Sequence, residues 1–217
     1  MKKPVYIISV DDFSEEINGY LQSDFHERLE ALLELNNCII ENGIIINIAD
    51  DFYLNFIRLL NKYKVEYLIT GGFAVNFYGY PRNTHGMDLW INPHANNSKK
   101  LLCAIDEFGY DSSILKELHL NEIEAIKLPH DRNPFKKIEI LAGFSGAYDF
   151  SKSFADRSVV EYNGVQMSFI PYHDLIAGKT GSLKFKDIDD IRVLYQIAGK
   201  EEYENNFEAN RTDLLGQ

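Results

Sequence analysis

Residues 65–91 read VEYLITGGFAVNFYGYPRNTHGMDLWI, and this stretch decides the predicted fold. Residues 65–70 are typical of a β-strand. Gly71, Gly72 and then a short predicted helix follow this strand. A second predicted strand, 86–92, returns Asp88 to the two glycines. Backbone N–H groups at such a turn can bind phosphates, and carboxylates can bind the accompanying cation. The stretch therefore indicates a site for a metal-bound triphosphate.

Two acids are candidate ligands of that cation. Side chains alternate along a strand, so Asp88 lies on the opposite face from its apolar neighbours, and so does Glu139 between Ile138 and Ile140. On adjacent strands near the glycine turn, these two carboxylates could hold Mg²⁺, which takes oxygen ligands. For either acid taken alone, a solvated strand face is the commoner explanation.

Helices and strands alternate around this stretch, which favours an α+β or α/β fold with a mixed central sheet flanked by helices. We expect residues 1–48 to be a small N-terminal appendage of unknown role, residues 49–170 to be the core, and residues 171–217 to be C-terminal helices and a polar tail. Further elements are predicted as follows: helices 25–35, 51–63, 97–108, 171–177 and 187–198; strands 5–10, 122–128, 136–141, 158–162 and 165–170, the last two around the turn Asn163-Gly164.

The order of these motifs resembles the nucleotidyltransferase superfamily, whose fold is shared with DNA polymerase β. The Gly-Gly pair, a short helix, Gly-x-Pro-Arg-x-Thr, a strand with a metal-binding Asp and a later acidic strand follow one another as in that family. The segments 174–179 and 184–190 are similar to C-terminal helices of its small bacterial branch, found in toxin–antitoxin and abortive-infection systems. The resemblance covers roughly residues 50–198.

The resemblance implies a role for each matching residue. Gly71 and Gly72 would bind the β and γ phosphates of a nucleoside triphosphate. Asp88 would be the second of the family's two metal-binding Asp residues, and Glu139 would occupy the position of the family's third acid. These two acids would be catalytic through the Mg²⁺ that they hold.

Three basic residues, Arg82, Lys179 and Lys184, would contact phosphates or substrate, although surface charge explains them equally well. One departure is clear, because the first metal Asp of the family falls on Gly86. Changes around a metal site commonly cost about ten- to a hundredfold in affinity or activity. We therefore expect weak or absent transfer activity.

Composition limits the partners. The chain has 217 residues, of which 45% are hydrophobic, and a net charge of −11. This charge makes nucleic acid an unexpected partner without a local basic groove. The apolar run 5–10 is too short for a signal segment or membrane span, and Cys38 and Cys103 lack metal-ligand spacing. We therefore expect a cytoplasmic protein with no membrane partner.

Three functions remain open from the sequence. The first is a Mg²⁺-dependent nucleotidyltransferase that moves a nucleoside monophosphate to a hydroxyl of a protein or RNA. The second is a non-catalytic module of the same fold, which senses a nucleotide or binds a toxin-like protein partner; Gly86 favours it. The third is an α/β interaction domain in which the motif order is accidental.

Overall fold

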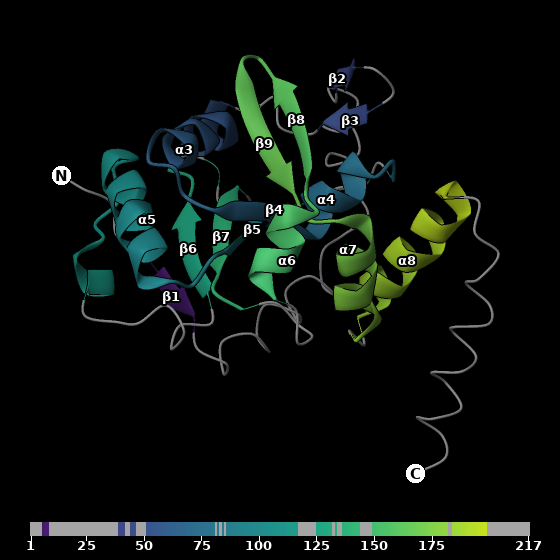
Figure 1. Ribbon diagram of the computed structural model, residues 1–217. Coiled ribbons are helices and arrows are strands. Elements are labelled where there is room, and N and C mark those ends of the chain that lie inside the picture. The colour runs from purple at the N-terminus through teal and green to yellow at the C-terminus, as the bar shows by residue number, and fades with distance from the viewer. Residues whose placement is uncertain are drawn as a thin grey trace, which may run out of the picture.

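A computed structural model of the chain describes residues 6–8, 39–41, 44–46, 51–80, 82, 84, 86–116, 125–131, 133, 136–143, 149–181 and 184–198. Within these ranges, seven strands form one mixed sheet (Figure 1). Their order across the sheet is β1 (Tyr6–Ile8), β6 (Ala125–Pro129), β7 (Lys137–Leu141), β5 (Gly86–Ile91), β4 (Tyr67–Thr70), β9 (Val165–Phe169) and β8 (Ser158–Tyr162).

Parallel and antiparallel pairs alternate in the middle of this sheet. Strand β5 runs parallel to β7 and antiparallel to β4, and β4 runs parallel to β9. The outer pairs, β1 with β6, β6 with β7 and β8 with β9, are antiparallel. A separate pair joins β2 (Ile39–Glu41) and β3 (Ile44–Ile46). The central strands β4, β5 and β7 therefore bring three distant parts of the sequence together.

Helices pack around the sheet. Figure 1 shows α3 (Asp51–Lys62) and α5 (Ala95–Glu107) at one end of the molecule and α7 (Tyr172–Thr180) beside α8 (Phe185–Ile197) at the other. Helix α7 also contacts the short α4 (Gly71–Phe77), which follows β4. Among the described residues, the remaining helical elements are α6 (Phe150–Ala155) and a 3-10 turn, Ser113–Lys116. Among the described helices, none is long and apolar enough to cross a membrane.

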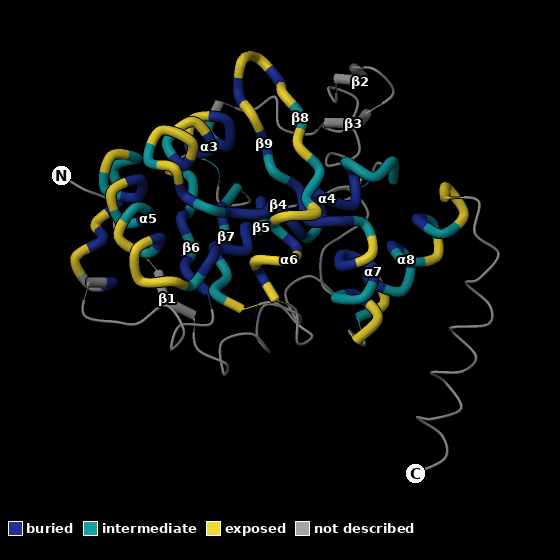
Figure 2. Tube along the Cα trace, in the orientation of Figure 1, coloured by how far each residue is buried: buried dark blue, intermediate teal, exposed yellow. Residues whose placement is uncertain are grey.

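The hydrophobic core lies along the central strands, as the dark blue segments of Figure 2 show. Met87 and Leu89 are fully buried on one face of β5. On the other face, Trp90 packs against Phe150 of α6, with ring centroids 5.1 Å apart. Asp88 is half-buried between these positions. The sheet is therefore covered on both faces at Trp90, while Asp88 lies nearer the start of β5.

The predicted fold class, a mixed sheet flanked by helices with further helices at the C-terminal end, is confirmed. The predicted hairpin around Asn163-Gly164 forms β8 and β9. The predicted strands 122–128 and 136–141 correspond to β6 and β7, which pair antiparallel. Helix α6 was not predicted. The predicted helix 25–35 lies outside the described residues. Strand β1 pairs with β6 at the edge of the main sheet. The division of the chain into three parts at residues 48 and 170 stays a prediction.

Candidate functional site

Four polar residues form one row across four neighbouring strands. Thr70 of β4 is paired with Asp88 of β5, Asp88 with Glu139 of β7, and Glu139 with Lys127 of β6. Directly paired residues of adjacent strands present their side chains on the same face of a sheet. The structure therefore places the two predicted acids, Asp88 and Glu139, side by side.

The turn at Gly71 lies directly against this row. Gly71 has φ +60°, a left-handed conformation that glycine adopts without strain. A Cβ atom on Gly71 would lie 1.7 Å from Oδ2 of Asp88, and one on Gly72 would lie 2.4 Å from Oγ1 of Thr84. A side chain at either position would therefore clash with a neighbouring side chain. Gly71 packs against the Asp88 carboxylate, which joins the glycine turn and the acids into one site.

The two acids are electrostatically linked. Burial, the negative charge of Glu139 and a hydrogen bond shared with Glu139 together raise the pKa of Asp88 to about 7. The positive charges of Lys186 and Lys137 act in the opposite direction and do not cancel this rise. The Asp88 carboxyl consequently exchanges a proton near neutral pH. Such a perturbed pair of carboxylates is characteristic of functional sites.

Two lysines contact Glu139. Its Oε1 atom lies 3.3 Å from Nζ of Lys127 and 3.2 Å from Nζ of Lys137. The side chains of all three residues are about one-fifth exposed, with 21%, 22% and 19% for Lys127, Lys137 and Glu139. Partial exposure leaves the ion pairs weakened by water but accessible to a ligand.

Lys137 also occupies the space beside Gly86, where the resemblance expects an Asp. The two residues are paired between β5 and β7. A Cβ atom on Gly86 would lie 2.9 Å from Cγ of Lys137 and 3.0 Å from its carbonyl oxygen. A side chain at position 86 would therefore need Lys137 to move. The side chain of Lys137 thus fills the space that a side chain at position 86 would take.

Arg82 and Lys179, both predicted phosphate contacts, take part in a buried ion network. The Arg82 guanidinium binds both carboxylate oxygens of Asp190, with Nε to Oδ1 at 2.5 Å and Nη2 to Oδ2 at 2.9 Å. The Lys179 ammonium lies 2.7 Å from Oδ2 of Asp190 and 2.6 Å from Oδ1 of Asp187. This network fixes α7 and α8 to the segment that precedes β5, so Lys179 has a structural task whether or not it meets a phosphate.

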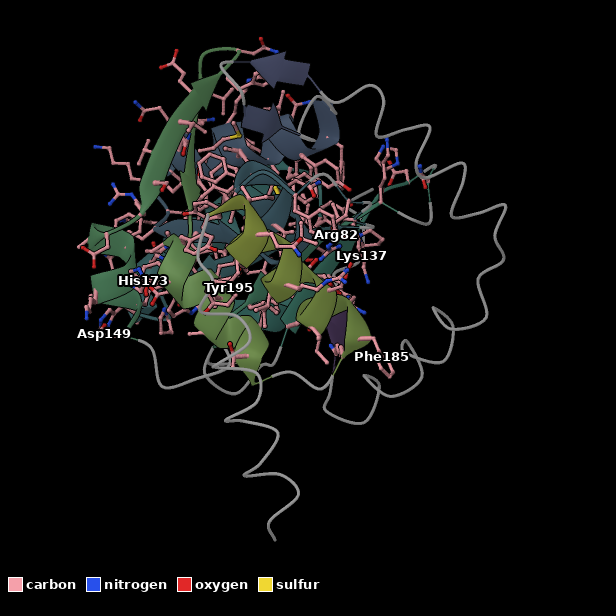
Figure 3. All side chains as sticks on the ribbon, turned by 90° about the vertical axis from the view of Figure 1, so that its right-hand side faces the viewer. Arg82, Lys137, Asp149, His173, Phe185 and Tyr195 are labelled. Atoms are coloured by element: carbon pink, nitrogen blue, oxygen red, sulfur yellow. The ribbon has the colours of Figure 1, made fainter. Side chains whose placement is uncertain are left out.

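Arg82 nevertheless faces the site. Its Nη1 atom lies 3.2 Å from where a Cβ of Gly72 would be, so the guanidinium reaches the second glycine. Figure 3 shows Arg82 and Lys137 on one side of the molecule, away from Asp149 and His173. Lys184 is the N-cap residue of α8. The roles of Arg82, Lys179 and Lys184 as phosphate contacts stay predictions.

Several residues of the site were not predicted from the sequence. Lys186 acts on the charge of Asp88, and its own pKa is lowered by burial of its ammonium group and by the charge of Arg82. Lys137 precedes Glu139 by two residues, so strand alternation already placed both on one face. Lys127 carried no such signal, because its place opposite Glu139 depends on the register between β6 and β7.

The donor set does not fit the pair of Mg²⁺ ions that the resemblance implies. Two carboxylates face each other where the family has three, and one of them has two ammonium groups on a single oxygen. In the described part of the chain, no group of three or more His, Cys, Asp or Glu side chains is arranged to hold a metal ion. Mg²⁺ needs several oxygen ligands at short distance, and ammonium groups repel it.

Comparisons with known proteins give distant structural similarities. No model of a known protein family and no curated protein matches this sequence. The lincosamide antibiotic adenylyltransferase LnuA, solved with lincomycin bound, is 17% identical, with 69% of this chain and 98% of that chain covered and a TM-score of 0.48. The antibiotic-resistance factor ANT(2'')-Ia is 13% identical, with 76% and 92% covered and a TM-score of 0.44.

A third solved structure is an antigenic nucleotidyltransferase-like protein from Paracoccidioides brasiliensis, 17% identical over 74% of this chain and 85% of that chain, with a TM-score of 0.44. Two of these three names contain adenylyltransferase or nucleotidyltransferase, the family that the sequence motifs resemble.

Proposed function

We propose that this protein binds a nucleoside triphosphate in a nucleotidyltransferase-like site and transfers its nucleoside monophosphate slowly or not at all. One observation carries the proposal: Asp88 and Glu139 lie side by side, and the Asp88 carboxylate packs against the Gly71 turn. The order of motifs places these same residues at the triphosphate site of the family that they resemble. The phosphates would then lie near the N–H groups of Gly71 and Gly72.

The proposed weakness of transfer follows from charge. In transfer, an acceptor hydroxyl oxygen bonds to the α-phosphorus, the bond from that phosphorus to the bridging oxygen breaks, pyrophosphate leaves and the hydroxyl proton passes to water. Positioned positive charge stabilises this reaction's transition state. With Gly86 in place of an acid and Lys137 beside it, the site has lost ligands for the ions that supply that charge.

Nucleotide binding without turnover, as in a sensor, is the second candidate function, and the contact between Gly86 and Lys137 favours it. The two candidates share the binding step and differ in the transfer. A toxin-like protein partner would be an addition to either, and would be found by its co-purification with the tagged protein.

Calorimetric titration with each of the four ribonucleoside triphosphates tests the shared step. We expect one or more to bind, and Gly71→Ala to weaken that binding at least about tenfold because its Cβ would displace Asp88. Gly164→Ala is a matched control: Gly164 has φ +70° in the β8–β9 turn, and a Cβ there meets no atom within 4 Å. Absence of binding to all four nucleotides would reject the proposal.

Transfer is tested with labelled triphosphates, Mg²⁺ or Mn²⁺ and a cell lysate as the source of acceptors. Label that moves onto a protein or RNA, and that Asp88→Ala abolishes, would identify an active transferase. Nucleotide binding with no labelled acceptor would identify the sensor.

A further inference from the structure

The position of Lys137 has a consequence for how the site would bind phosphates. Its side chain covers Gly86, with Cγ and Cε 2.9 and 3.5 Å from where a Cβ of Gly86 would be, and its ammonium lies 3.2 Å from Oε1 of Glu139. The aliphatic part thus fills the space of the missing acid. The positive end lies among the carboxylates, where the related enzymes of the resembled family would hold a metal ion.

The charges around the two acids differ in kind from those of a metal site. Three lysines, Lys127, Lys137 and Lys186, act on the carboxylates of Asp88 and Glu139. An acidic cluster would need divalent cations before it could accept a triphosphate, because like charges repel. Here the protein itself supplies the opposing charge.

A buried hydroxyl in the same row points to a ligand. Thr70 is 1% exposed, and its Oγ1 has no hydrogen-bond partner among the described residues. It lies opposite Asp88 on β4, next to the glycine turn. A buried hydroxyl without a hydrogen bond destabilises the protein. A bound phosphate oxygen that accepts a hydrogen bond from Thr70 would remove this cost.

We propose that the ammonium group of Lys137 takes the place of a metal ion, so that the site binds the phosphates of a nucleotide without a divalent cation. The inference rests on the nucleotide-binding function proposed above. Lys137 and Lys186 would neutralise the phosphates through charge-assisted hydrogen bonds, and Thr70 would donate a third. Glu139 holds Lys137 in position through the contact between Oε1 and Nζ.

The inference also explains why Gly86→Asp alone would not rebuild a metal site. The new side chain would start 2.9 Å from Cγ of Lys137, so the lysine has to leave before an Asp can turn toward Asp88. The double variant Gly86→Asp, Lys137→Ala removes the contacts with Cγ and Cε, so that only the carbonyl oxygen of residue 137, 3.0 Å away, has to shift slightly. We expect only the double variant to bind Mn²⁺ measurably by electron paramagnetic resonance; Mn²⁺ binding by the wild-type protein would contradict the inference.

The main test measures the affinity of the tightest-binding ribonucleoside triphosphate in EDTA and in excess Mg²⁺. The wild-type protein is expected to bind it in EDTA within about threefold of its affinity in Mg²⁺. Lys137→Met, which keeps the length of the side chain, should weaken binding in EDTA by about ten- to a hundredfold, as for loss of a hydrogen bond to a charged group. Lys137→Arg should retain most of the affinity.

The control is Lys99→Met, at an exposed lysine on α5, which should bind as the wild type does. Binding only in Mg²⁺ would overturn the inference and leave the proposed function standing. No binding in either solution would overturn both. The comparison of EDTA with Mg²⁺ uses the wild-type protein. It therefore shows whether binding needs a divalent cation even if Lys137→Met fails to fold.

Discussion

Two acidic clusters of this protein lie close together in space and differ in how their charges are arranged. Around Asp190, which is fully buried, each carboxylate meets positive partners, a bidentate Arg82 and the ammonium of Lys179. Around Asp88, another acid, Glu139, acts together with burial to raise the pKa, and the charges of Lys186 and Lys137 do not cancel this rise. The first arrangement satisfies its carboxylates within the protein, whereas the second keeps two carboxyl groups in contact and surrounds them with lysines.

The difference separates structural charge from functional charge. Removing one member of a buried ion network exposes the others to an unfavourable environment, so such networks matter for stability. Like charges held side by side cost stability and persist where a ligand or a proton compensates them. Arg82 belongs to both clusters, because it binds Asp190 and also reaches Gly72. The Asp190 network therefore holds α7 and α8 where Lys186 can act on Asp88.

The largest expected effect is on the Asp190 network. Asp190→Ala should lower the free energy of unfolding by about 3 to 5 kcal/mol, because Arg82 loses both bonds to Asp190 and Lys179 loses one partner. Urea unfolding measures the change. Lys62→Ala is the control: Lys62 is 57% exposed and pairs with Glu107, so water screens this ion pair and its loss should change the free energy of unfolding much less. Equal effects of the two substitutions would remove the distinction between the clusters.

A smaller effect of opposite sign is expected at Asp88. Its pKa is about 7 in the folded protein against a reference of 3.8, so the folded state binds the proton more tightly. This stabilisation is fully present below about pH 4 and is lost as the pH rises through 7. Asp88→Asn lacks that loss and should be more stable than the wild type at pH 8, where the wild-type carboxyl is ionised.

Urea unfolding at pH 5 and pH 8 checks this prediction. Asp156→Asn, at an exposed carboxyl at the end of α6, is the matched control for the loss of one carboxyl group. A variant Asp88→Asn that follows the wild-type pH dependence would mean that Asp88 does not titrate as the geometry requires.

The smallest expected effect is on the pKa of Asp88 itself. Glu139→Gln removes the negative neighbour but leaves the burial, which is the largest cause of the raised pKa. The pKa of Asp88 should therefore fall and still stay above its reference value. Carboxyl carbon shifts in a ¹³C NMR titration report it directly, and a pKa that rises or does not move would contradict the contact between the two acids.

Strand alternation in the sequence was enough to place Asp88 and Glu139 on the polar faces of their strands, and the glycine pair marked the turn beside them. Register was not predictable: the pairing of β6 with β7 brings Lys127 to Glu139, and no local pattern encodes it. The Arg82 network was beyond reach for a similar reason, since Arg82 and Asp190 are 108 residues apart. A basic residue that resembles a phosphate contact in sequence can equally pair with a distant acid.

The most direct test of the proposed phosphate site is a crystal structure with a nonhydrolysable nucleoside triphosphate, grown in EDTA. We expect phosphate oxygens within hydrogen-bond distance of the Gly71 or Gly72 N–H groups and of the Lys137 ammonium. A nucleotide bound away from the Thr70, Asp88, Glu139 and Lys127 row would contradict this expectation.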